Sequence, residues 1–303
     1  MLSVIVVGSA NSAFDVIDDT ATAGLTTTMV ARSPTYVFPW AYAQVRESLG
    51  LYEVLPAALA DKLLMTGPTA VDGQLVRGLY QALARKEPAR YQPLAAAGFP
   101  VYDSLDGRTD LMMHITERGG GHFNDIGNGV ALIVAGKVAV KAGVAPVAYE
   151  EGGRGLVFAD GSVVRADAIV WCTGFRDKDR GVTAEVLGGK MFVDDDDDDD
   201  GNCGGDGGGV VGGDEEGVSA SASGAKSRII GPHEVAALRD GVWGVDKEGE
   251  IRGCFERHLR VDNYWITGGT TTQHRLFSLP IALQIKAALE GVLPAAWRET
   301  PEL

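Results

Sequence analysis

A short run of small residues near the amino terminus has the composition of a phosphate-binding turn. It follows a strand-like apolar stretch at 4–7 and leads into a helical pattern. Small residues let the backbone approach a pyrophosphate, and the free amides at a helix start attract its negative charge. The turn therefore predicts binding of a dinucleotide phosphate. The residues expected to surround the phosphate are Gly8, Ser9, Ala10, Asn11, Ser12 and Ala13.

The residue after the next strand-like run indicates which dinucleotide this turn would bind. Arg32 and Ser33 directly follow residues 26–31. A carboxylate in this position binds the ribose hydroxyl of NAD, whereas an arginine accommodates the 2′-phosphate of NADP. The sequence therefore predicts NADPH. Ala10 replaces the usual second glycine of such a turn. The alternative to a nucleotide site is a parallel sheet with a small-residue turn that binds no ligand.

A second strand end with glycine lies near the middle of the chain. Residues 168–172 predict a buried strand, and Thr173 and Gly174 follow it. Ligands bind at the carboxyl ends of parallel strands, so both residues are candidates to contact a cofactor. A simple turn is the alternative.

A third such strand end lies close to the carboxyl terminus. Residues 263–267 predict a strand that leads into Gly268 and Gly269, and Gln273 follows in a loop. Paired glycines that face a helix start suit an anionic or electron-rich ligand. Ser278 is expected to cap the last helix. A terminal strand–helix unit that only closes the fold is the alternative.

These candidates depend on alternating strands and helices to position them. The first helix has one apolar face and is expected to end near Gly24. Asp160 and Gly161, between two β-rich runs, predict a hairpin within an antiparallel meander. The last helix is expected to have Pro280 in its first turn. It is expected to pack against the sheet through Ile281, Leu283, Ile285 and Leu289.

The region between the first unit and the meander predicts helices. They are expected at 44–51, 57–65 and 74–85, with a break at Asp72 and Gly73. We expect them to cover the sheet, and a substrate channel is the alternative. Short strands are then expected at 131–134, 138–141, 144–149, 155–159 and 162–165.

The negative charge of the chain is concentrated in one segment. The formal net charge is −14, and without the eleven carboxylates between Asp194 and Glu216 it would be −3. The rest is nearly neutral, so nucleic acid is not an expected partner. Residues 194–225 are rich in aspartate, glycine and serine and are expected to be disordered. Calcium binding is the alternative, but no EF-hand spacing is present.

Cysteine and histidine usage excludes several classes of protein. The three cysteines, Cys172, Cys203 and Cys254, are far apart and odd in number, which favours a reducing, cytoplasmic location. The absence of a CxxC pair argues against a dithiol reductase, and no histidine has metal-ligand spacing. No apolar stretch reaches the roughly 18 residues needed to span a membrane. The sequence does not indicate an oligomeric state.

Three segments together resemble the flavin-containing monooxygenases, with the fungal and YUCCA-like branch most similar. The family's NADPH site resembles VVGSANSAFD at 6–15 together with ARSPT at 31–35. Its Thr-Gly strand end resembles ADAIVWCTGF at 166–175, and its closing flavin segment resembles 268–287. Order and spacing agree over nearly the whole chain outside the acidic insertion.

The resemblance implies an α/β fold and an oxygenase activity. The fold would be a doubly wound parallel sheet of the FAD/NAD(P)-binding type, with an antiparallel β-meander and a helical insertion. An NADPH-binding domain would span 1–165, with its helical insertion at about 40–125. Residues 166–303 would form the remainder of the FAD-binding domain, interrupted at 194–225. The activity would be NADPH- and FAD-dependent oxygenation of a small organic substrate through a flavin hydroperoxide.

The resemblance also implies roles for single residues. The turn from Gly8 to Ala13 would hold the NADPH pyrophosphate, and Arg32 and Ser33 the 2′-phosphate. Gly268, Gly269 and Gln273 would face the flavin. The cofactors carry the chemistry, so no side chain is nominated as a catalytic acid or base.

One departure from the family concerns the first FAD-binding motif. Family members place that motif before the NADPH strand, whereas this sequence begins just ahead of the strand. We therefore expect a truncated member. The alternatives are a catalytically inactive NADPH-binding fragment and another flavoprotein reductase with two dinucleotide sites.

Overall fold

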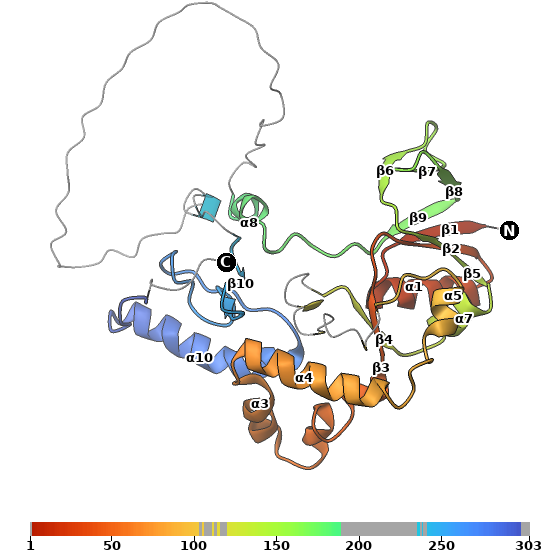
Figure 1. Cartoon of the computed structure of the whole chain (residues 1–303). Coiled ribbons are helices and arrows are strands. Elements are labelled where there is room, and N and C mark those ends of the chain that lie inside the picture. The colour runs from red at the N-terminus through yellow and green to blue at the C-terminus, as the bar shows by residue number, and fades with distance from the viewer. Residues whose placement is uncertain are drawn as a thin grey trace, which may run out of the picture.

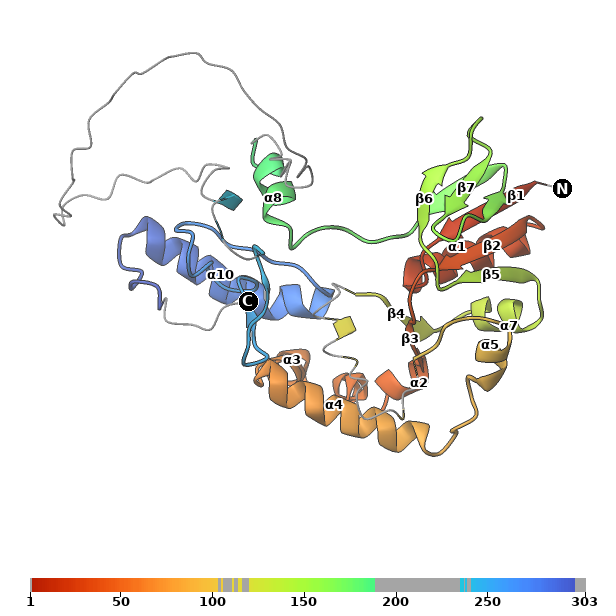
Figure 2. The same ribbon diagram turned by 45° about the horizontal axis from the view of Figure 1, so that its top comes forward.

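The computed structural model describes most of the chain on either side of the acidic insertion. The described residues are 2–102, 105, 111, 114–115, 120–188, 235–236, 238 and 241–297. The insertion at 194–225 lies outside them. Figures 1 and 2 show a sheet-containing amino-terminal part and a carboxyl-terminal part whose main element is the long helix α10 (Thr271–Leu289). A long extended stretch leads from the sheet to α8 (Arg180–Val186).

A four-stranded parallel sheet forms the core of the amino-terminal part (Figure 1). Its strand order is β5-β2-β1-β9, and every neighbouring pair runs parallel. Strand β1 lies inside the sheet because its four consecutive aliphatic residues are buried. The predicted α/β fold with a parallel sheet is confirmed. The strands are β1 (Ser3–Val7), β2 (Thr26–Ala31), β5 (Val138–Ala142) and β9 (Ala168–Trp171).

Helices cover one face of this sheet and the meander covers the other. Phe14 of α1 stacks on Phe123 with ring centroids 3.6 Å apart, beside Leu94 and Ile133. On the opposite face Phe158 packs against β1 and β2. Burial of each of these side chains contributes roughly 1.5–3 kcal/mol. The covering elements are α1 (Asn11–Thr22), α5 (Gln92–Ala96), α7 (Gly129–Val134), β6 (Pro146–Tyr149), β7 (Gly155–Phe158) and β8 (Val163–Arg165).

The helical insertion joins the sheet to the carboxyl-terminal part. It begins at β3 (Tyr36–Pro39), which pairs in parallel with β4 (His122–Asp125). In both views α10 lies apart from the sheet (Figures 1 and 2), and it contacts α3 of the insertion. The remaining elements are α2 (Trp40–Ala43), the 3-10 helix η1 (Leu49–Glu53), α3 (Ala57–Met65), α4 (Thr69–Ala84), β10 (Gly244–Val245), β11 (Ile251–Arg252) and α10 (Thr271–Leu289).

A carboxylate from the carboxyl-terminal part caps a helix of the insertion. Glu250 accepts hydrogen bonds from the backbone amides of Thr69 (2.8 Å) and Ala70 (3.3 Å), which begin α4. The residue before the helix is Pro68, and it provides no side-chain cap. A negative charge at a helix start is favourable. Glu250 therefore provides, from a distant segment, the helix cap that Pro68 cannot provide.

Some predicted elements are confirmed and others are not. The helix predicted at 57–65 is α3. The hairpin at Asp160 and Gly161 forms, with Gly161 at a φ of 78°. The strand predicted at 263–267 is wrong, since only an isolated bridge between Trp265 and Arg257 forms there.

Three predictions in the helical and meander regions are wrong. Helix α4 passes through Asp72 and Gly73 without a break, and Asp72 lies in its first turn. Residues 44–51 are not an α-helix, and η1 occupies Leu49–Glu53. Residues 131–134 form part of α7 rather than a strand, because a short apolar run does not distinguish the two.

The last helix begins about two turns before the predicted cap. Helix α10 starts at Thr271, and Thr270 and Gln273 form a reciprocal capping box in front of it. Ser278 therefore lies within the helix, and so does Pro280. The prediction of Ser278 as the cap is wrong because a stronger signal lies upstream.

Two predictions about burial are also wrong. Leu283, Ile285 and Leu289 are 59%, 38% and 83% exposed, so this face of α10 does not pack on the sheet, whereas Ile281 is buried. Strand β9 is at the edge of the sheet, and its terminal Trp171 is 47% exposed. An apolar run shows that burial is favourable, but it does not show which neighbour provides it.

The first testable prediction concerns the turn after β1. Gly8 has a φ of 136°, and a Cβ built there would lie 2.3 Å from the carbonyl oxygen of Cys172. Gly8→Ala should therefore reduce the free energy of unfolding by roughly 3 kcal/mol or more, through backbone strain and overpacking together. Urea denaturation measures the loss.

Gly24→Ala is the matched control. Gly24 has a φ of 80° but open space around its Cβ position, so strain alone should cost about 1–2 kcal/mol. Equal losses in the two variants would show that the close approach to Cys172 is unimportant.

Candidate functional site

The predicted phosphate-binding turn lies at the carboxyl edge of the parallel sheet. The amide of Gly8 donates to the carbonyl of Val30 at 3.0 Å, which joins the turn to β2. The amide of Cys172 donates to the carbonyl of Val7 at 2.7 Å, which joins β1 to the end of β9. Three strand ends therefore meet around Gly8.

Helix α1 begins without a side-chain cap. Its N-cap residue is Ala10, and the first turn contains no acidic residue. The Ala10 carbonyl accepts from the amides of Ala13 and Phe14, whereas the amides of Asn11 and Ser12 have no acceptor among the described residues. Unsatisfied amides at a helix start form an anion-binding position.

The side chains of this turn are mostly committed to structure. Thr35 donates to the hydroxyl of Ser9 at 2.6 Å, and the Asn11 side chain accepts from the backbone amide of Asn124 at 2.9 Å. Ala13 is fully buried. The backbone of the turn therefore remains as its means of contacting a ligand.

Arg32 provides a positive charge at the same edge of the sheet. It directly follows β2, is exposed, and forms no ion pair with a described residue. Strands β1 and β2 are adjacent and parallel, so Gly8 and Arg32 extend beyond the same edge. Ser33 is partly buried next to it.

Thr173 and Gly174 follow Cys172, whose carbonyl approaches Gly8 in this turn. Thr173 and Gly174 are exposed and begin the extended stretch toward α8. Cys172, just before them, is partly buried, and burial raises the pKa of its thiol. Thr173 and Gly174 thus follow the end of β9, which contacts Gly8.

The third group of candidates lies in the carboxyl-terminal part and serves the start of α10. The Gln273 side chain accepts from the backbone amide of Thr270 at 2.8 Å. A Cβ at Gly269 would lie 2.0 Å from that Gln273 oxygen, so the capping box itself requires glycine there. Gly268 is partly buried, with open space at its Cβ position.

Sequence reasoning missed a buried carboxylate that fixes α10 to α3. Arg275 donates to both oxygens of Asp61, at 2.7 and 2.5 Å, and the Tyr52 hydroxyl donates to Asp61 at 2.7 Å. The Asp61 side chain is 2% exposed. Hydrogen bonds from Arg275 and then Tyr52 lower the pKa of Asp61 to about 2. The available signal was a carboxylate inside a helical run in which Lys62 is the one other charged residue.

Comparisons with known proteins give only weak structural similarity. No family model and no curated protein matches the sequence. An oxidized steroid monooxygenase bound to NADP is 17% identical with a TM-score of 0.33, over 57% of this chain and 38% of that one. A closed crystal structure of cyclohexanone monooxygenase is 14% identical with a TM-score of 0.32, over 57% and 38%.

A third similar structure is the ornithine hydroxylase PvdA from Pseudomonas aeruginosa. It is 14% identical with a TM-score of 0.29, over 58% of this chain and 36% of that one. The matched part of the chain therefore spans less than two fifths of each of these proteins. In the part of the chain that the structure describes, no helix has the length and hydropathy to cross a membrane.

The second prediction concerns acid stability. The folded pKa of Asp61, about 2, lies below the roughly 3.9 of an unfolded aspartate. Its ion pair therefore stabilises the fold above about pH 4, and this stability is lost as the pH falls toward 2. Asp61→Asn should destabilise the protein at pH 7 and weaken the decline in stability between pH 5 and pH 3, as measured by urea denaturation.

Asp19→Asn serves as the control because Asp19 is exposed on α1. It should leave both the stability at pH 7 and its decline toward pH 3 unchanged. An Asp61→Asn curve parallel to the wild-type curve would contradict the role assigned to this ion pair.

Proposed function

We propose that this chain binds NADPH at the β1–α1 turn and acts as an NADPH- and FAD-dependent monooxygenase on a small organic substrate, as a relative of the flavin-containing monooxygenases. The observation that supports it most is the uncapped start of α1, whose Asn11 and Ser12 amides lack an acceptor among the described residues. They adjoin a turn that requires glycine at Gly8. The doubly wound fold and the domains 1–165 and 166–303 are part of this proposal.

Each part of the nucleotide would have a different partner. The backbone from Gly8 to Ala13 would hold the pyrophosphate, because the Asn11 and Ser12 amides at the helix start have no acceptor among the described residues and such amides bind anions. Arg32 and Ser33 would bind the 2′-phosphate, since the guanidinium is exposed at the same edge. An arginine forms short, charge-assisted hydrogen bonds with phosphate.

The flavin part of the proposal rests on glycines with open space. Gly174 and Gly268 have no atom within 4 Å of their Cβ positions, so a planar ring could approach their backbones. Thr173, Gly269 and Gln273 would complete these contacts. Bound FAD would supply the redox and oxygen chemistry, and the chain would bind and orient it. The two described cysteines are free thiols, which supports a reducing, cytoplasmic location.

The separation between the amino-terminal sheet and the carboxyl-terminal part favours a second candidate function, an NADPH-binding module without flavin. Helix α10 lies apart from the sheet in both views (Figures 1 and 2), and Gly268 and Gly269 directly precede its N-cap residue Thr270. Gly8 and Arg32 follow adjacent parallel strands of that sheet, whereas Gly268 belongs to the segment before α10.

The third prediction tests the choice of nucleotide. Arg32→Ala should weaken NADPH binding by roughly 10- to 150-fold, because a charge-assisted contact contributes about 1.5–3 kcal/mol. NADH binding should change little, since it lacks the 2′-phosphate. Isothermal titration of both nucleotides measures the two effects.

Lys137→Ala provides the control for charge. Lys137 is exposed and precedes β5, at the amino edge of the sheet, opposite Arg32. This variant should bind NADPH as the wild type does. Equal binding of NADPH and NADH by the unmutated protein would refute the assignment of Arg32.

The fourth prediction separates the two candidate functions. We expect purified protein incubated with FAD and freed of excess flavin to retain a bound-flavin absorbance spectrum, which NADPH then bleaches. NADPH binding without flavin retention would establish the second candidate instead. Retention of neither cofactor would overturn both.

A further inference from the structure

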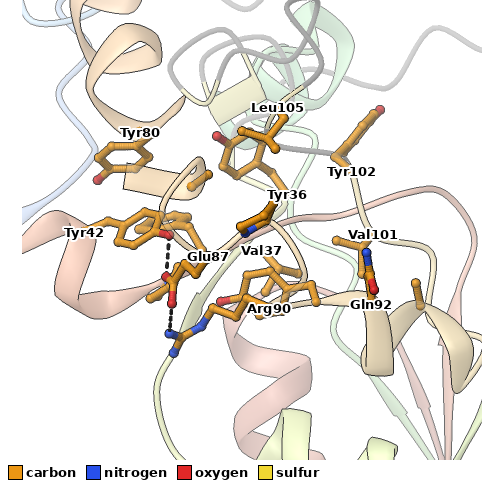
Figure 3. A pocket seen from close by; sticks show the side chains of 16 residues that line it. Tyr36, Val37, Tyr42, Tyr80, Glu87, Arg90, Gln92, Val101, Tyr102 and Leu105 are labelled. Carbon is orange, nitrogen blue, oxygen red and sulfur yellow. Dashed lines mark hydrogen bonds and ion pairs between the residues drawn. The ribbon is translucent and has the colours of Figure 1, made fainter. Parts of the chain in front are cut away.

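We propose that a tyrosine-lined cavity of the helical insertion binds a small, uncharged aromatic alcohol or phenol. The cavity has a volume of about 230 Å³ and lies between β3, the end of α4 and the segment that leads into α5 (Figure 3). It is distinct from the β1–α1 turn. The proposal does not depend on nucleotide or flavin binding.

The volume restricts the occupant to roughly one aromatic ring with a short substituent. Drug-sized ligands occupy pockets of about 300–1,000 Å³, whereas a cavity of about 150 Å³ holds benzene. A volume of about 230 Å³ therefore fits a ring with a few further atoms.

The walls of the cavity are aromatic rings set at an angle to one another. Phe38 and Tyr80 have ring centroids 5.2 Å apart and an interplanar angle of 47°. Tyr42 and Tyr80 are 5.9 Å apart at 69°, and Tyr36 lies 6.1 Å from Phe38 at 63°. Tyr36, Phe38 and Tyr80 are nearly fully buried. A further aromatic ring would extend this edge-to-face series, and an aliphatic molecule would not gain those contacts.

The charges that line the cavity are already paired with each other. Tyr42 donates to one oxygen of Glu87 at 2.5 Å, and Arg90 donates to the other at 2.8 Å, as the dashed lines in Figure 3 show. Arg90 also lies 3.9 Å from Asp125. A charged ligand would lose its hydration without gaining an unpaired counter-charge, which is costly. The cavity therefore favours an uncharged molecule.

One kind of polar group on the ligand remains favourable. Each carboxylate oxygen of Glu87 receives one of these hydrogen bonds, and a carboxylate offers about four acceptor positions. The Tyr42 hydroxyl oxygen is an acceptor as well. A ligand hydroxyl that donates a hydrogen bond would use this remaining capacity, whereas an ether would not.

The test uses four related probes on the full chain without cofactors. The reference probe is 4-methylphenol. Relative to it, 4-methylanisole lacks the hydrogen-bond donor, 4-methylcyclohexanol lacks the aromatic ring, and 4-methylbenzoate is charged. Ligand-detected NMR titration should show saturable binding of 4-methylphenol, with each other probe at least tenfold weaker. Absence of saturable 4-methylphenol binding, or equal binding of all four, would overturn the proposal.

Matched substitutions locate the binding. Ala84 lines the cavity and is buried, whereas Ala82 on the same helix is exposed. Ala84→Phe should abolish 4-methylphenol binding, and Ala82→Phe should bind it as the wild type does. Ala95→Phe fills the cavity from an exposed position on α5, so it provides a second blocking variant if Ala84→Phe fails to fold. Unchanged binding in a folded blocking variant would refute the cavity as the site.

Discussion

The close approach of the β1–α1 turn to the end of β9 constrains the whole carboxyl edge of the sheet. A Cβ at Gly8 would lie 2.3 Å from the Cys172 carbonyl oxygen, so only glycine allows both strands to keep their positions. This packing directs the chain from β1 into α1 and leaves the first amides of the helix at the edge where Arg32 emerges. Backbone geometry and charge therefore combine at one place, although few of the side chains there are free to contact a ligand.

Elements whose cause is local were predictable from the sequence. Strand β1 is an uninterrupted aliphatic run, and the hairpin at Asp160 and Gly161 follows from the φ that glycine allows. Elements whose boundaries depend on a choice between competing local signals were not predictable. The start of α10 depends on Thr270 and Gln273 rather than Ser278, and the two signals differ only by the reciprocal hydrogen bonds that the folded chain forms. Short apolar runs such as 131–134 are equally ambiguous.

The candidate sites divide in the same way. The turn at Gly8 and the position of Arg32 follow from a single strand–helix–strand unit, so residue spacing alone predicted them. The ion pair of Asp61 with Arg275 joins residues 214 positions apart, and no spacing rule anticipates it. The tyrosine-lined cavity likewise combines β3 with the end of α4 and the segment beyond. Sites built from distant segments require the fold to be known first.

The helical insertion, rather than the sheet, fixes the carboxyl-terminal part. Arg275 of α10 is held by Asp61 of α3, and Glu250 caps the first turn of α4. Both contacts use a carboxylate that is paired across a large sequence separation, and both lie on the insertion. The expectation that these helices only cover the sheet is therefore too narrow. Gly268 and Gly269 directly precede the N-cap of α10, so their position depends on the contacts that hold this helix to α3.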